Sequence, residues 1–207
     1  PSDNRSALIG GSRPPQLAPG TYQVKLVKGK DTYETEFTIT TDPDSPYTAA
    51  DRAVQREAVM KLFNDTEDLA YVYEVLDQVQ QQASSIQRKT TKKRVDEMAS
   101  AIRDLAGKEK SRLAFRGGDF YVNEGSMLRE EMGNLYFSVS SFPGRPSDSQ
   151  LQEAVRIHQA LVAARGKLDL FLTNDVAKLN EKLGEEAQIT WPAKAAYLAA
   201  EVDVSGM

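Results

Sequence analysis

Two acidic runs are the residues of this chain that come closest to an acid–base site. They comprise Asp65, Glu67 and Asp68 in one segment and Glu130 and Glu131 in another. Paired carboxylates hydrolyse glycosidic bonds when they lie roughly 5–10 Å apart across a substrate cleft. Because adjacent residues on a helix point to different sides, we interpret both runs as solvated helix faces. A glycan-acting hydrolase domain stays open as an alternative.

The single histidine, His158, lies among Val155, Ile157 and Leu161. A role in proton transfer would require a partner within hydrogen-bond reach. Its position on or beside an apolar stripe favours a packed, structural histidine. With no cysteine and one histidine, the sequence argues against a zinc or copper site. We therefore expect no catalytic residue, no metal and no cofactor in this chain.

A basic cluster places five positive charges within the seven residues 88–94. Such a cluster could bind phosphate or nucleic acid, but no aromatic side chains interleave for base stacking, and the net charge of the chain is −4. Cations beside a helix C-terminus offset the helix dipole. We interpret the cluster as a solvated turn between helices and expect no nucleic-acid partner.

The overall composition is that of a globular protein, with 40% hydrophobic and 27% charged residues among 207. No stretch approaches the roughly 18 apolar residues needed to cross a bilayer, so we expect no membrane span. The first residues contain neither a methionine nor a secretion signal. We expect that the chain begins inside a longer precursor.

The first element expected is a β-hairpin within residues 17–41, which looks like the end of a β-sandwich. Apolar and polar residues alternate along both of its strands, and a turn is expected around Lys28–Asp31. An isolated two-stranded hairpin is marginally stable in water, so its apolar face needs a cover. The helices that follow or strands upstream could supply it. Residues 1–16 are expected to be a linker or a fragment of an upstream element.

Two long helices are expected after the hairpin. The first, of about 40 residues, begins at a capping box formed by Thr48 and Asp51 and continues through heptad-spaced apolar positions. The second begins at a capping box formed by Ser147 and Gln150 and ends at Gly184. Its apolar register drifts over residues 168–172, which predicts a stutter or a kink.

Two shorter helices are expected between them, over residues 91–113 and 126–139. The predicted fold is therefore mainly α: an up-down four-helix bundle over residues 42–187, with two long and two short helices, preceded by the β-hairpin. Residues 188–207 form a C-terminal tail. In this tail, segments 189–192 and 202–204 could add a short strand.

Seven residues are candidates for an interface with another protein or domain. Aromatic side chains can line a sugar-binding surface by ring stacking, but they more often cover the end of a bundle. We therefore assign the candidates structural or interface roles. They are Tyr22, Val24, Phe37 and Ile39 on the hairpin, and Tyr136, Phe142 and Trp191 elsewhere.

The junction between hairpin and first helix resembles the C-terminal region of bacterial sortilin-type β-propeller proteins, often labelled glycosyl-hydrolase-like or exo-α-sialidase-like. The segments that carry the resemblance are 18–26, 37–40, 42–43 and 145–150 with 175–180. The resemblance implies an upstream propeller and an exported, periplasmic or secreted protein. No Asp-box repeat (Ser-x-Asp-x-Gly-x-Thr-Trp) occurs in this chain, so no functional residue of the propeller can be transferred to it.

The sequence thus predicts a non-catalytic accessory or interaction module at the C-terminus of an exported multidomain β-propeller protein. Its expected partners are the upstream domains of the same polypeptide, and a further protein partner or a homo-oligomer is possible. Besides the glycan hydrolase, a self-associating helical adaptor stays open, because heptad-patterned helices can pair between chains.

Overall fold

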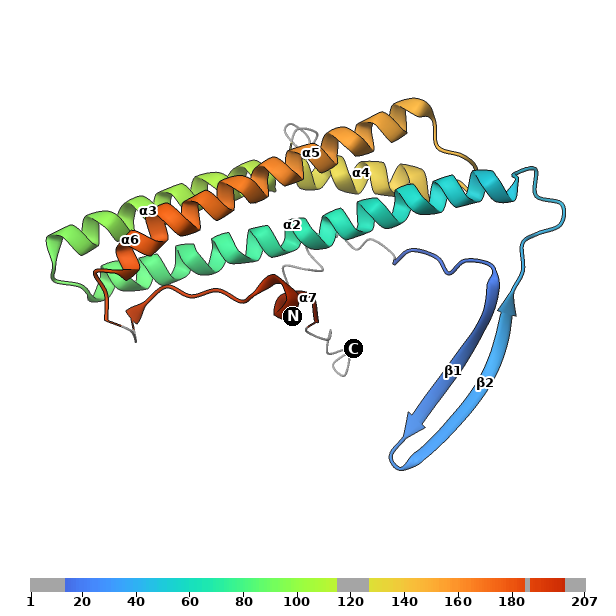
Figure 1. Ribbon diagram of the computed structural model, residues 1–207, viewed down its shortest axis with the longest axis horizontal. Coiled ribbons are helices and arrows are strands. Elements are labelled where there is room, and N and C mark those ends of the chain that lie inside the picture. The colour runs from blue at the N-terminus through green and yellow to red at the C-terminus, as the bar shows by residue number, and fades with distance from the viewer. Residues whose placement is uncertain (1–13, 115–126, 185–186, 200–207) are drawn as a thin grey trace, which may run out of the picture.

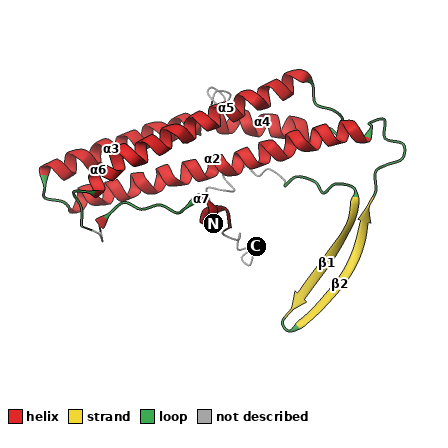
Figure 2. Ribbon diagram, in the orientation of Figure 1, coloured by secondary structure: helices red, strands yellow, loops and turns green. Residues whose placement is uncertain are grey.

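A computed structural model describes residues 14–114, 127–184 and 187–199 (Figure 1). The predicted fold class is confirmed: the chain is mainly α, behind an N-terminal antiparallel β-hairpin (Figure 2). In chain order the elements are β1 (Gly20–Lys28), β2 (Asp31–Ile39), α2 (Ala49–Lys89), α3 (Lys93–Leu113), α4 (Leu128–Ser140), α5 (Asp148–Phe171), the π-helical turn η2 (Leu172–Val176), α6 (Ala177–Asn180) and α7 (Lys194–Ala199).

The long helix α2 is the element on which the rest of the bundle is built. It begins at the predicted capping box: the Thr48 hydroxyl accepts a hydrogen bond from the Asp51 amide at 3.1 Å, and the Asp51 carboxylate accepts one from the Thr48 amide at 3.0 Å. The Thr48 hydroxyl also donates to the Asp51 carboxylate at 2.6 Å, and this bond together with the one from the Thr48 amide holds the pKa of the Asp51 carboxyl below its usual value. Along its 41 residues, heptad positions such as Leu62, Leu69 and Val79 are fully buried.

The helices α3 and α4 follow one another along α2, whereas α5 with its continuation through η2 and α6 runs along the bundle beside them (Figure 1). The up-down order expected from the sequence is not followed by α3 and α4, which run in the same direction. A cross-section therefore cuts three helices, not four. A helix of 41 residues is long enough to carry both shorter helices end to end, because each residue adds about 1.5 Å.

The second long helix continues from α5 through η2 into α6, close to its predicted extent. Its capping box is present, with the Ser147 hydroxyl accepting from the Gln150 amide at 3.2 Å. The π-helical turn over Leu172–Val176 begins where the apolar register was expected to drift. An inserted π turn rotates the following residues relative to the preceding helix. Val176 and Leu179 consequently return to the core, each at 0% exposure.

The segment after α6 packs on the bundle without forming the short strand expected at 189–192. Asn180 binds both backbone groups of Ile189, at 2.8 and 2.9 Å, and Gln82 binds both backbone groups of Thr190, at 2.7 and 3.0 Å. Because side-chain amides satisfy these backbone groups, no strand partner is needed. Ile189 is buried in the core, and α7 follows. The second expected strand segment, 202–204, lies outside the described residues.

The bundle and the hairpin should differ sharply in their response to loss of a leucine side chain. Leu69→Ala removes a fully buried group and should lower the free energy of unfolding by about 2–5 kcal/mol. Leu26→Ala, at a position 60% exposed on β1, should change it by less than about 0.5 kcal/mol. Denaturant unfolding followed by helical circular dichroism measures both. An equal decrease in the free energy of unfolding for both variants would show that the hairpin and the bundle share one core.

Candidate functional site

The hairpin presents an apolar face whose side chains are paired across the two strands. The register places Tyr22 opposite Phe37, Val24 opposite Thr35 and Leu26 opposite Tyr33. The rings of Tyr22 and Phe37 are stacked, with centroids 5.6 Å apart. The predicted alternation is thereby confirmed, and these side chains share one face because side chains alternate along a strand.

The opposite face of the hairpin is mostly charged and polar, and Val27 is its one apolar residue. Lys25 lies opposite Glu34, with 3.7 Å between Nζ and Oε1, and the Gln23 amide donates to Glu36 at 3.3 Å. The turn falls where it was predicted, and Gly29 adopts a φ of 62° at its first position. Glycine at this position suits the tight two-residue turns whose twist matches that of the flanking strands.

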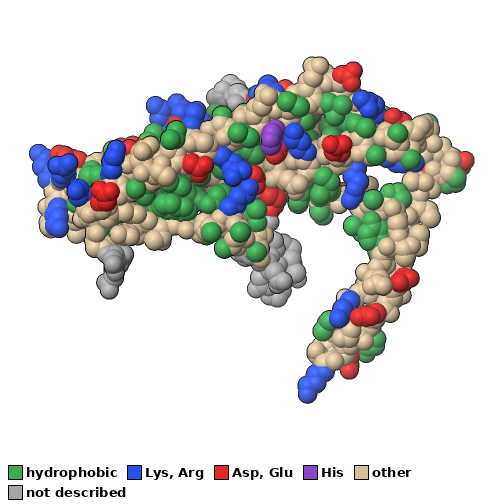
Figure 3. Space-filling view, in the orientation of Figure 1, with side chains coloured by type: hydrophobic (Ala, Val, Ile, Leu, Met, Phe, Trp, Pro, Cys, Tyr) green, Lys and Arg blue, Asp and Glu red, His purple; other side chains and the backbone are tan. Residues whose placement is uncertain are grey.

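The apolar face of the hairpin is open, because the hairpin extends away from the bundle (Figures 1 and 3). Val24 is 40% exposed, Phe37 42% and Tyr33 57%. Tyr22 and Ile39, at the end nearer the bundle, are half-buried. The helices that follow the hairpin do not cover this apolar face, although they were predicted from the sequence as one of two possible covers.

The ends of the hairpin are attached to the start of α2. Arg56 donates a hydrogen bond to the carbonyl of Gln16 at 2.9 Å. After β2, a turn is formed at Asp42, whose carboxylate accepts from the Asp44 amide at 2.9 Å. Tyr47 then packs edge-on against Phe142, with ring centroids 5.1 Å apart. The bundle thus holds the hairpin at its base and leaves its strands free.

The three aromatic candidates outside the hairpin do not form a common surface. Tyr136 lies in the core, where burial raises the pKa of its hydroxyl. Trp191 is partly buried against the core, in the segment that precedes α7. Phe142 alone is largely exposed, at 51%. Of the seven candidates, the four on the hairpin therefore make the only cluster with an open face in the described part of the chain.

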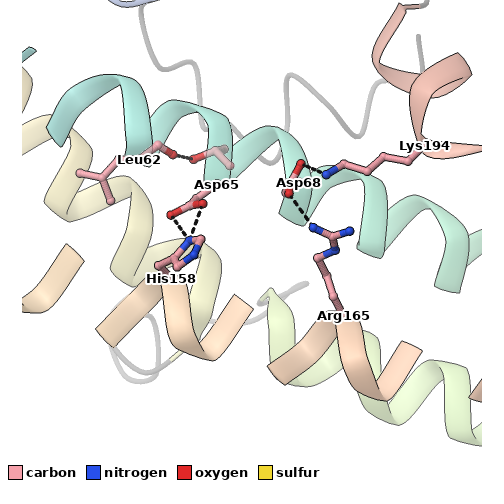
Figure 4. A network of polar contacts seen from close by, with 7 residues as sticks. Leu62, Asp65, Asp68, His158, Arg165 and Lys194 are labelled. Atoms are coloured by element: carbon pink, nitrogen blue, oxygen red, sulfur yellow. Dashed lines mark hydrogen bonds and ion pairs between the residues drawn. The ribbon is translucent and has the colours of Figure 1, made fainter. Parts of the chain in front are cut away.

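Two carboxylates of the acidic run on α2 contact residues of α5 and the tail (Figure 4). Asp65, 6% exposed, accepts from His158 Nδ1 at 2.9 Å. Asp68 binds Arg165 at 3.1 Å and Lys194 at 2.6 Å. Asp65 and Asp68 are one helical turn apart and join α2 to different residues. The run is thus not a solvated face: both carboxylates hold helices together.

Both carboxylates of the second acidic run, Glu130 and Glu131, form ion pairs with arginines. Glu130 forms an ion pair with its neighbour Arg129, and Glu131 binds Arg156 at 2.6 Å. Arg156 also binds Glu153 at 2.6 Å, and this hydrogen bond lowers the pKa of the Glu153 carboxyl. A carboxylate that is engaged by an arginine suits a structural contact better than the acid of a glycosidase.

A cavity of about 360 Å³ lies between α2, the end of α3, the start of α4 and α5. Its rim carries the pairs Glu109–Arg112 and Glu131–Arg156 together with Lys167. Since four of these five charges are paired, the cavity offers a ligand mainly apolar contacts. Its apolar lining includes Val72, Leu76, Leu113, Leu128, Leu168 and Phe171.

The basic cluster lies in the turn from α2 to α3, as expected. Arg88 and Lys89 belong to the last turn of α2, and Lys92 to Arg94 to the start of α3. All five side chains are exposed. In the described residues no helix is long and apolar enough to cross a membrane, and no three potential ligands are grouped as for a metal ion.

One buried charge pair was not predicted from the sequence. Lys110 on α3 pairs with Asp77 on α2 and donates to Gln80 at 2.9 Å, and its Nζ lies 5.2 Å from the centre of the Tyr73 ring. A signal was present, because Lys110 shares the helical stripe of Ala106 and Leu113, which are buried. Burial of a lysine on such a stripe calls for a carboxylate opposite it.

No protein-family model, curated protein or solved structure matches this chain.

The contact between His158 and Asp65 should stabilise the fold. His158→Ala leaves a carboxylate that is 6% exposed without this hydrogen bond, which should lower the free energy of unfolding by about 1–3 kcal/mol. Lys167→Ala, an exposed change on the same helix, should lower it by less than about 0.5 kcal/mol. Denaturant titration compares the two variants. Equal stability of His158→Ala and the parent chain would contradict a structural role.

Proposed function

We propose that this chain is a non-catalytic accessory and interaction module at the C-terminus of an exported, multidomain β-propeller protein. The observation that carries the proposal is the apolar face of the hairpin, which projects from the bundle with Val24, Tyr33 and Phe37 exposed (Figure 1). Exposed contiguous apolar surface marks a site of contact with another folded unit. The hairpin is therefore the part through which the module acts.

The structural difference between the bundle and the hairpin supports this proposal. The bundle has a continuous buried core from Ala58 on α2 to Ile189 in the tail, and its acidic runs are engaged in ion pairs. A two-stranded hairpin has no core of its own and is marginally stable alone. The bundle acts as the rigid support, and the hairpin acts as the contact element that gains stability from its partner.

The partner is the upstream part of the same polypeptide. The resemblance of segments 18–26, 37–40 and 42–43 to the C-terminal region of sortilin-type proteins supports this assignment, and it also supports a periplasmic or secreted location. A contact within one polypeptide needs less affinity than a contact between separate chains, because the linkage raises the effective concentration.

Hydrogen exchange in the hairpin tests this function. The polypeptide that joins this chain to the residues N-terminal to Pro1 in its reading frame is called here the extended polypeptide. In the chain alone, amides of β1 and β2 should exchange nearly as in an unfolded chain, while those of α2 are protected. In the extended polypeptide, the hairpin amides should slow by at least about 100-fold, which corresponds to roughly 2.7 kcal/mol of added stability.

Exchange in α2, far from the hairpin, is the internal control and should be the same in both polypeptides. Unchanged hairpin exchange in the extended polypeptide would contradict the proposed contact. An upstream reading frame without propeller blades would contradict the assignment of the parent protein, while leaving the contact itself to stand on the exchange result.

Self-association is a second candidate function, favoured by the outer face of α5. Val155, Val162 and Leu170 lie about two helical turns apart on this face and are 49%, 54% and 63% exposed. Apolar residues at such spacing can form a helix–helix seam between two copies.

If α5 pairs two copies, the chain should sediment as a dimer at micromolar concentration. Val162→Asp should convert it to a monomer, because a charge would be buried at the centre of the seam. Lys167→Asp, a charge change at an exposed position on the same helix, serves as the control. A monomeric mass for the parent chain at this concentration would eliminate the second candidate.

A further inference from the structure

The hydroxyl of Tyr22 makes a contact that the other hairpin residues do not share. Located at the third residue of β1, it donates a hydrogen bond of 2.6 Å to the carbonyl of Ala18, four residues upstream, in a partly buried position. The tyrosine therefore closes the turn by which the chain enters β1. The side chain also stacks on Phe37 of β2, so the ring is fixed on both sides.

In β-sandwiches of the immunoglobulin type, a tyrosine near the start of strand F makes this kind of contact. Its hydroxyl donates to the backbone a few residues upstream, at the corner that leads from strand E to strand F. We infer that β1 and β2 are the F and G strands of such a sandwich, and that its remaining strands come from the same polypeptide, N-terminal to Pro1.

The side-chain pattern after Tyr22 agrees with this assignment. In antibody domains, the residue two positions after the tyrosine is the cysteine that points toward the other sheet. Here that position is Val24, an apolar residue on the same face as Tyr22 and Leu26. The face that would meet the second sheet is thus the face that is left open.

The order of the elements agrees as well. F and G are consecutive strands joined as a hairpin, and G is the last strand of the domain. In this chain β2 is followed by the turn at Asp42 and then by the long helix α2. Among the described residues β1 and β2 form a two-stranded sheet with no third strand.

The assignment distinguishes the two edges of the hairpin. Strand F pairs with strand C on one side and G on the other, so β1 is a central strand with an unfilled edge. As strand G, β2 lies at the edge of the completed sheet. It carries Asp31, Glu34 and Glu36, and charged side chains protect an edge strand from further pairing.

The inference rests on the proposed function, because it names the structure that covers the hairpin face. Its test compares Tyr22→Phe with Tyr33→Phe in the extended polypeptide, read out by hydrogen exchange. Both residues lie on the apolar face, but the Tyr33 hydroxyl has no hydrogen-bond partner among the described residues. Removal of the Tyr22 hydroxyl should speed exchange in β1 by about 2- to 10-fold, and removal of the Tyr33 hydroxyl should not.

A second readout comes from the parent extended polypeptide. Alternate amides of β1, those that face away from β2, should be protected by strand C, whereas the outward amides of β2 should exchange fast. If the hairpin is protected but both tyrosine variants behave alike, or both edges exchange fast, the sandwich assignment is overturned and the accessory role stands. If the hairpin gains no protection at all, both are overturned.

Discussion

A two-stranded ribbon cannot cover its own apolar face, and the organisation of this chain follows from that constraint. On α2, the apolar stripe is covered by α3, α4 and α5, so residues such as Leu69 and Val75 are fully buried. On the hairpin, Val24, Tyr33 and Phe37 pair across the two strands and stay exposed on one face. The same alternation that makes the strands leaves one face without a partner.

The bundle is well suited to support such an element. It is held together along α2 by apolar packing, by the buried ion pair between Asp77 and Lys110 and by the hydrogen bond between Asp65 and His158. Breaking such a pair on one side leaves a charge without compensation, so these contacts favour one arrangement of the helices. The contacts of Arg56 and Tyr47 then connect this rigid body to the hairpin.

Local signals in the sequence predicted local structure well. The two capping boxes, the hairpin turn and the place of the π turn all depend on residues a few positions apart, and they are found where they were expected. Features that depend on distant residues were not predicted. Three such features arise from tertiary packing: the end-to-end arrangement of α3 and α4, the burial of Tyr136, and the hydrogen bonds between Asn180 and the Ile189 backbone. The Tyr22 contact is local, and its spacing from Ala18 was visible in the sequence.

The central claim is that the apolar face of the hairpin is covered in the extended polypeptide. Because this chain contains no cysteine, a single Val24→Cys provides a clean probe of that face, and Lys25→Cys probes the opposite one. Reaction with a maleimide measures both. N-terminal extension should slow labelling at position 24 by about 100-fold relative to position 25. Equal labelling rates at the two positions in the extended polypeptide would contradict this claim.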